Sequence, residues 1–212
     1  LIIVPRDRGI GEETTVSSSP VVVWRQLLKN RPAIGAILYF FFIGIANDNI
    51  FVVYSSWLES SYALSLVALG VGTSVIGFAE IGGELLTAIF SDRIGLKRAV
   101  YIGTTFSIIS FLVLPFLDVG LPFALTALFL IFVSFEFSIV SSFGLCTELA
   151  PESRATLMSG LFASAGVGRV IGASVGGPIW LKAGLPAIGI VSATSTFLGL
   201  LCLFWGLKGW KR

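Results

Sequence analysis

The chain has 212 residues, of which 55% are hydrophobic and only 12% are charged, with a formal net charge of +2 and no histidine. A soluble domain of this length does not need so apolar a composition, and the small net charge gives no reason to expect nucleic acid as a partner. Without histidine the chain lacks the commonest general base and the usual metal-ligand spacings, so we expect neither an enzyme nor a metal site.

Residues 1–30 form the first predicted segment, a cytoplasmic linker. Residues 6–20 are polar and rich in serine, threonine and glycine, which is typical of a flexible connection. Residues 21–29 combine apolar and basic side chains and predict a short amphipathic helix on the inner membrane surface. The chain begins with Leu1 rather than methionine, and residues 1–4 look like a helix end, so we expect a longer parent polypeptide.

Residues 31–212 predict a transmembrane domain. Nearly uncharged runs of about 20 residues, long enough to cross a bilayer, are expected to form six transmembrane helices. The composition and these runs predict an all-α membrane protein. The six predicted spans are 33–58, 66–90, 99–117, 122–146, 155–181 and 184–207.

The lysines and arginines outside these spans predict the orientation. All of them except Lys182 fall on the side that carries both termini. Because positively charged loops stay inside, both termini are expected to be cytoplasmic, in a protein of the cell membrane. Cys146 and Cys202 lie at or within spans, and we expect no disulfide between them.

Charged residues inside the predicted spans are the strongest functional signal. Placing a charged side chain at the bilayer centre costs about 3 kcal/mol even on the scales that give the lowest cost. Charged residues at this depth are therefore expected to be functional. Such residues line substrate and proton pathways in transporters. The spans contain four acids and one base: Asp48, Glu80, Glu84, Glu136 and Arg169.

The first span contains three consecutive polar residues, Asn47, Asp48 and Asn49. Three neighbouring side chains on a helix project over a wide arc and cannot all face lipid. Some of them are expected to line a water-filled cavity, although a cluster that only fixes neighbouring helices stays an open alternative. Nearby aromatic residues are expected mainly to pack or to face lipid, but could also line a cavity: Tyr39, Phe40, Phe41, Phe42, Phe135, Phe137 and Trp180.

Glu80 and Glu84 lie one turn apart in the second span and are expected to share a face. Two neighbouring acids away from bulk water repel each other, which makes them candidate proton carriers. Glu84 could instead reach the cytoplasmic surface or pair with basic residues there. Glu136 and Arg169 lie at matching depth and form the first candidate ion pair, with a structural and a functional role both open.

The fifth span carries small residues at every fourth position. Such a stripe lets a neighbouring helix approach closely and predicts a packing seam, with a sliding surface as the alternative. The members of the stripe are Gly160, Ser164, Gly168, Gly172 and Gly176.

The connection after the second span has the sequence Ser-Asp-Arg-Ile-Gly-Leu-Lys-Arg over residues 91–98. It resembles the loop signature of the major facilitator superfamily, which occurs after the second helix and, more loosely, after the eighth. The chain departs from the signature at Ala88 and Leu96, as the looser copy does. The matching residues, which the resemblance gives a cytoplasmic gating role, are Asp92, Arg93, Gly95, Lys97 and Arg98.

Two further stretches are similar to the same family. Pro151 and Arg154 match the Pro-x-x-Arg pattern before the eleventh helix, which adds Arg154 to the gating set. Residues 168–178 are similar to the glycine-rich stretch of the family's antiporters, here at a pseudo-equivalent helix. A linker followed by six spans looks like the family's C-terminal half, helices seven to twelve.

The resemblance implies a secondary transporter that pairs with an N-terminal six-helix half and works by alternating access. The excess of acids suggests coupling to a proton gradient, with no other cofactor, and efflux of a small drug-like or metabolite molecule is the first expectation. Uptake of a sugar or an organic acid is the alternative within this class. A non-transporting scaffold or assembly subunit, and a natural half-transporter acting as a homodimer, are the alternatives outside it.

Overall fold

The computed structural model describes residues 20–210. The polar linker predicted over residues 6–20 lies almost wholly outside this range. Residues 20–210 contain no strand, and the fold class is all-α. The α-helices are α1 (Pro20–Leu27), α2 (Arg31–Phe51), α3 (Tyr54–Tyr62), α4 (Leu66–Leu86), α5 (Asp92–Ile94), α6 (Leu96–Val113), α7 (Leu121–Leu149) and α8 (Arg154–Gly206).

Local sequence signals account for several helix ends. Pro32 lies in the first turn of α2, where the missing N–H costs no hydrogen bond. The Ser65 hydroxyl accepts a hydrogen bond from the Ala68 N–H and caps α4. Gly95, with φ of 87°, separates α5 from α6 in a conformation that favours glycine. Each break therefore follows from side-chain or backbone chemistry at that position.

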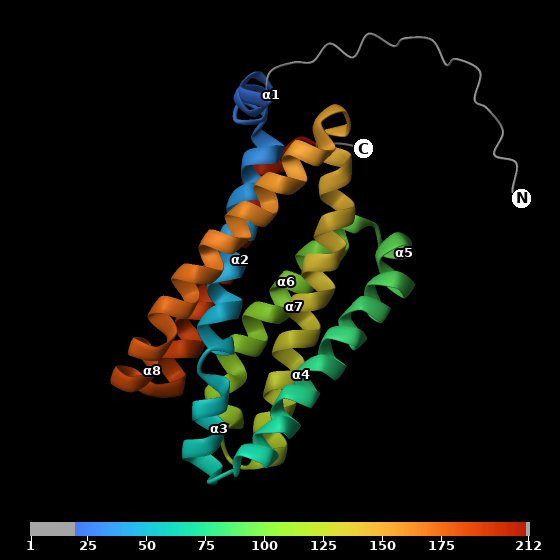
Figure 1. The fold of residues 1–212 in the computed structure, drawn as a ribbon. Coiled ribbons are helices and arrows are strands. Elements are labelled where there is room, and N and C mark those ends of the chain that lie inside the picture. The colour runs from blue at the N-terminus through green and yellow to red at the C-terminus, as the bar shows by residue number, and fades with distance from the viewer. Residues whose placement is uncertain (1–19, 211–212) are drawn as a thin grey trace, which may run out of the picture.

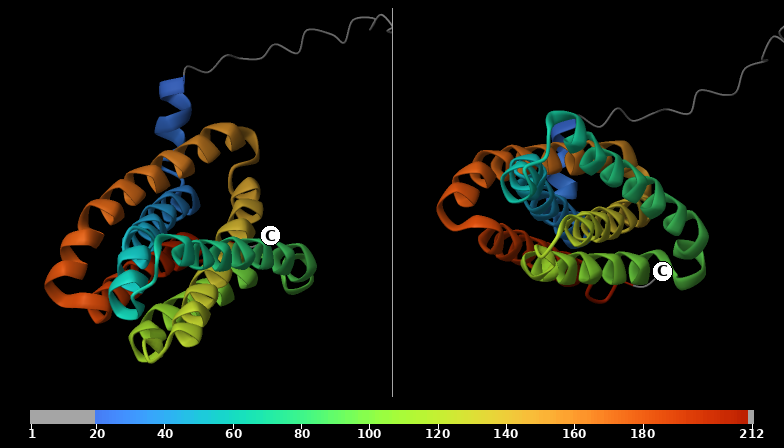
Figure 2. Two further views of the ribbon diagram at one scale, coloured as in Figure 1. Left: turned by 60° about the horizontal axis from the view of Figure 1, so that its bottom comes forward. Right: turned by 90° about the horizontal axis from the view of Figure 1, so that it is seen from below.

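The helix α8 consists of two legs. Its 53 residues would extend about 80 Å if straight, far more than a bilayer is thick. Gly184, with φ of 67° and ψ of −164°, interrupts the helical backbone and turns the chain back. Both legs then pack against α2, which α8 wraps around (Figures 1 and 2).

The remaining long helices form a second group, in which α7 packs against both α4 and α6. The α6 helix also contacts α8 and so connects the two groups. Figure 1 places α1, the end of α8 and the α7–α8 connection at one end of the molecule, the terminal end, with α3 at the opposite end. Short helical turns complete the connections: a π-helical turn at Thr87–Ser91 and 3-10 turns at Leu114–Leu117 and Pro151–Ser153.

The first predicted span, 33–58, is split between α2 and α3. The helix is interrupted after Phe51 and resumes at Tyr54. At the end opposite the termini, Trp57 Nε1 and the Tyr62 hydroxyl both donate hydrogen bonds to Asp118 Oδ1, at 3.0 and 2.6 Å. These bonds fix α3 to the turn before α7.

Five segments of the described chain are long and apolar enough to cross a membrane, the last being Pro151–Gly206 with both legs of α8. Large apolar side chains are exposed along α4, α6 and α8, such as Phe78, Phe106 and Phe204. Water would not favour so much exposed apolar surface, but lipid does. The chain is therefore an integral membrane protein, as predicted.

The short helix α1 covers part of the predicted amphipathic segment 21–29. Its Trp24 ring lies against Gly160 in the first leg of α8, where a Cβ atom would come 2.5 Å from the ring. Leu27 is buried in the core cluster at the terminal end together with Leu157 and Leu161. The α1 helix is thus attached to the first leg of α8.

Candidate functional site

A cavity of about 320 Å³ lies between the two helix groups. Its volume is at the lower end of the range of ligand pockets, roughly 300–1,000 Å³. It contains four of the five charged residues that the sequence predicted within spans. Asp48, Glu80 and Glu136 lie close to the middle of their apolar segments, and Arg169 lies near the middle of the first leg of α8. The lining residues are Phe40, Ile43, Gly44, Asn47, Asp48, Phe51, Glu80, Phe135, Glu136, Ile139, Phe143, Phe162, Ala165 and Arg169.

Asp48 on α2 and Arg169 on α8 form an ion pair. Arg169 Nε lies 2.9 Å from Asp48 Oδ2. The Asp48 side chain is 10% exposed, whereas that of Arg169 is 60% exposed, so its guanidinium is only partly covered. The charge-assisted hydrogen bond joins the two elements at the cavity.

The predicted ion pair between Glu136 and Arg169 is wrong. Gly44 lies so close to α8 that a Cβ atom would be 2.7 Å from the Ala165 carbonyl oxygen. Asp48 and Arg169 each lie one turn further along their helices, so this close approach brings them together. Glu136 belongs to the other helix group. Depth in the membrane alone did not show whether Asp48 or Glu136 is the partner of Arg169.

Glu80 and Glu136 line the same cavity from α4 and α7. The two helices touch at Gly83, where a Cβ atom would lie 2.6 Å from Glu136 Cβ and 2.9 Å from the Phe137 nitrogen. Glu80 precedes this contact by one turn. Within residues 20–210 neither glutamate forms an ion pair or a hydrogen bond.

Glu84 does not line the cavity. It follows Gly83, and its side chain is exposed on the surface of the described bundle. One turn later, the Thr87 hydroxyl donates to the Gly83 and Phe137 carbonyl oxygens at 3.0 and 3.3 Å, which attaches the start of the π-helical turn to α7. Sharing a helical face with Glu80 was not enough to place Glu84 in the cavity.

The asparagines beside Asp48 have different surroundings. Asn47 lines the cavity, and its Oδ1 atom is buried without a hydrogen-bond partner among the described residues. Asn49 is fully buried on another side of α2, where its Nδ2 donates to Ser192 Oγ and the Ile188 carbonyl oxygen at 2.9 and 3.2 Å. Successive helical residues point about 100° apart, which separates the three side chains.

Two of the candidate aromatic residues, Phe40 and Phe135, line the cavity, and the other five do not. Sequence reasoning missed Phe51, Phe143 and Phe162, which do. Their positions contain a usable signal, because Phe51 follows Asp48 by three residues, Phe143 follows Glu136 by seven, and Phe162 precedes Arg169 by seven. Those spacings place each ring on the same helical face as a charged residue.

The stripe of small residues in the first leg of α8 lies against α2 and α1. Cβ atoms at Gly168 and Gly172 would overlap the carbonyl oxygens of Phe41 and Ile45, and one at Gly176 would lie 2.7 Å from that of Asn49. Ser164 Oγ donates to the Ile37 carbonyl oxygen at 2.7 Å. Backbone therefore packs on backbone over three turns, with Gly160 against α1.

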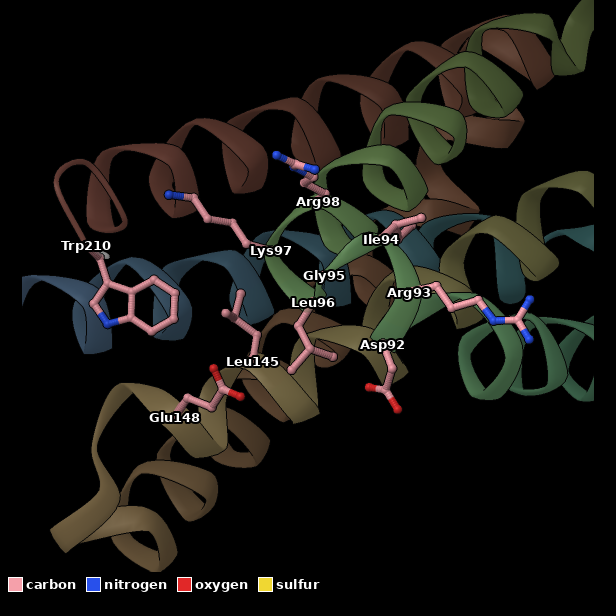
Figure 3. Close-up of a pocket in the computed structure, with 10 residues that line it drawn as sticks. All are labelled: Asp92, Arg93, Ile94, Gly95, Leu96, Lys97, Arg98, Leu145, Glu148 and Trp210. Atoms are coloured by element: carbon pink, nitrogen blue, oxygen red, sulfur yellow. The ribbon is translucent and has the colours of Figure 1, made fainter. Parts of the chain in front are cut away.

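A second, polar pocket of about 460 Å³ lies at the terminal end. Figure 3 shows Asp92 and Glu148 on one side of the loop, with the side chains of Arg93 and Lys97 pointing in different directions. Lys97 Nζ donates to the Leu207 carbonyl oxygen at 3.3 Å, a favourable position for a cation at a helix C-terminus. The five loop residues of the predicted gating set line this pocket, whereas Arg154, exposed at the start of α8, does not.

Comparison with known proteins decides the family. The model of the MFS_1 like family matches residues 5–188, most of the chain. The chain belongs to this family. The resemblance to the major facilitator superfamily is thereby confirmed, and family membership points to a transporter rather than an enzyme.

A curated relative supports the same family. The chain is 24% identical over 165 residues to an uncharacterized MFS-type transporter, YceJ, of Bacillus subtilis (strain 168). The match covers 78% of this chain and 42% of the relative, so the chain spans less than half the length of that family member.

Proposed function

We propose that the chain is the C-terminal six-helix half of a secondary transporter of the cell membrane. It exports a small organic molecule in exchange for protons and binds that molecule in the cavity between α2, α4, α7 and α8. The observation that carries the proposal is the position of this cavity, since three acids near the middle of apolar segments line it together with Arg169, near the middle of the first leg of α8. Charges at that depth are costly and are retained where they act on a substrate or a proton.

In this proposal the two legs of α8 cross the membrane separately, which gives six spans with both termini in the cytoplasm. The backbone reversal at Gly184 supports two crossings, because it folds both legs against α2. Lysines and arginines near the terminal end support the orientation. The loop from Asp92 to Arg98, with Arg154, then lies at the cytoplasmic gate.

An N-terminal half of the same polypeptide covers the open side of the cavity. The 60% exposure of the Arg169 side chain supports this part of the proposal. A guanidinium so exposed at mid-depth would otherwise face lipid, which costs several kcal/mol. Rocking of the two halves would then open the cavity to one side of the membrane at a time.

A non-transporting scaffold is the alternative from another class. Polar groups that only hold helices together are expected to bond to one another, as Asn49 Nδ2 does to Ser192 Oγ, although Asn49 Oδ1 has no partner within residues 20–210. Glu80 and Glu136 have no such partner within residues 20–210. This difference favours transport.

The test is proton movement in proteoliposomes that contain the full-length protein, under an imposed pH gradient and with a panel of organic cations, sugars and organic acids. We expect substrate-dependent proton movement in the native protein, its loss in Glu80→Gln, and its retention in Glu59→Gln, an exposed acid of α3 outside the cavity. If the folded protein moved no protons with any compound of the panel, the proposal of proton-coupled transport would be overturned. Unaltered coupling in Glu80→Gln would remove Glu80 from the mechanism.

A further inference from the structure

The charges of the cavity are unbalanced. Asp48, Glu80 and Glu136 supply three carboxylates, and Arg169 is the one basic residue among its lining side chains. Asp48 is already bonded to Arg169 through Oδ2. Two carboxylates therefore remain without a cationic partner within residues 20–210.

Unpaired carboxylates are unfavourable away from bulk water, and they gain most from a cation that enters the cavity. Glu80 and Glu136 approach the cavity from helices that touch at Gly83. A single positive group between α4 and α7 could therefore interact with both. An anionic ligand would have to bind Arg169 while three carboxylates face the same space, and a neutral ligand would leave both glutamates unpaired.

Aromatic rings from three helices also line the cavity, and they lie next to one another. The ring centroids of Phe40 and Phe143 are 5.4 Å apart, and those of Phe143 and Phe162 are 5.3 Å apart. Aromatic faces bind the apolar body of a ligand and also attract organic cations. An inorganic cation would make no use of these rings, since it prefers oxygen ligands.

The polar side chain of Asn47 also lines the cavity. Its Oδ1 atom is buried, as is Asn49 Oδ1 outside the cavity, and neither atom has a hydrogen-bond partner within residues 20–210. The carboxylates and the aromatic rings are therefore the groups on the cavity surface that a ligand meets.

We infer that the substrate of this cavity is an organic ammonium ion, a protonated amine attached to an apolar, preferably aromatic, body. The inference rests on the proposed function, because it takes the cavity as the substrate site. The ammonium group lies near Glu80 and Glu136, and the apolar body lies against Phe40, Phe143 and Phe162. Arg169 keeps Asp48 occupied, so the glutamates supply the negative charge that the amine meets.

The test uses three compounds with one body and different charge: 4-phenylbutylamine, 4-phenylbutanol and 4-phenylbutyrate. Their dissociation constants are measured with the full-length protein in lipid nanodiscs. We expect the amine to bind at least about tenfold more tightly than the alcohol, and the carboxylate to bind most weakly. A difference of about tenfold lies between the contribution of an exposed charge pair and that of a buried one. Equal affinity for the amine and the alcohol, or preference for the carboxylate, would overturn the inference.

Two variants locate the effect. Glu136→Gln and Glu80→Gln should each reduce the preference for the amine over the alcohol by about tenfold. Retained affinity for the alcohol shows that a variant is folded. If Glu136→Gln fails to fold, Glu80→Gln still tests the inference, because the Glu80 side chain is exposed in the bundle and its replacement disturbs less packing. Glu59→Gln is the matched control and should keep the native ratio. An unchanged ratio of amine to alcohol affinity in both Glu80→Gln and Glu136→Gln would overturn the placement of the ammonium group at these glutamates.

The outcome is separable from that of the proposed function. Amine-selective binding without any amine-dependent proton movement would support the ligand class and count against transport. Proton movement driven only by a sugar or an organic acid would support transport and overturn the ligand class.

Discussion

Arg169 Nε lies 2.9 Å from Asp48 Oδ2, and this bond connects α2 to the first leg of α8 at the cavity. The two residues are 121 positions apart in the chain. Their pairing depends on Gly44, which allows α2 to approach the Ala165 carbonyl. The ion pair is therefore a consequence of close helix packing as well as of charge.

Removing one partner of this pair should weaken the fold only moderately. We expect Asp48→Asn to reduce the free energy of unfolding by about 1 kcal/mol, because the Arg169 guanidinium is largely exposed in the described bundle and solvation compensates part of the loss. Thermal unfolding in detergent measures the change. In a double-mutant cycle with Arg169→Gln, additive losses would show that the pair contributes no coupling energy.

The glycines of α8 should differ in their tolerance of a methyl group. We expect Gly172→Ala to cost about 1–3 kcal/mol, because its Cβ would overlap the Ile45 carbonyl oxygen and force α2 away. Gly166→Ala is the matched control on the same leg, since no atom lies within 4 Å of its added Cβ. Unfolding midpoints of the two variants provide the comparison, and equal midpoints would contradict the close packing.

Asn49 should affect stability rather than ligand binding. Asn49→Ala removes the hydrogen bonds to Ser192 and Ile188 in a fully buried place, and we expect a loss of about 1–3 kcal/mol. Ligand affinity per folded molecule should remain close to native, since Asn49 does not line the cavity. A large loss of affinity with native stability would place Asn49 in the binding site after all.

Glu80 and Glu84 should contribute unequally to proton coupling. Glu80 lines the cavity and Glu84 does not, so we expect Glu80→Gln to reduce substrate-dependent proton movement far more than Glu84→Gln. Proton flux in proteoliposomes is the measurement. Similar losses in the two variants would mean that coupling depends on the face of α4 rather than on the cavity.

Asp92 should affect the rate of transport and not the affinity for substrate. It is exposed at the start of α5, directly after the π-helical turn, and lines the pocket at the terminal end but not the cavity between the helix groups. We expect Asp92→Asn to slow transport several-fold with an unchanged substrate dissociation constant. Native rates in this variant would remove the gating role that the loop resemblance implies.

The sequence predicted the membrane class, the family and the all-α fold, because hydropathy and loop motifs are local properties. It also predicted charged residues that the structure brings to one cavity, among them Asp48, Glu80 and Arg169. The partner of Arg169 was wrong, since Glu136 and Asp48 have similar depths and only the packing at Gly44 distinguishes them. The interruption after Phe51 was missed because residues 51–53 are apolar and contain no helix breaker.

The two sides of the cavity have unequal stiffness. On one side, Gly168 and Gly172 lie against the backbone of α2, and Gly206 of the second leg meets Gly35 nearer the start of the same helix. Backbone meets backbone at these glycines, so we expect Asp48 and Arg169 to move together. The α2 helix makes far less extensive contact with α7, which carries Glu136. We therefore expect the cavity to widen and narrow by displacement of its α4–α7 side, with the Asp48–Arg169 pair as the fixed reference.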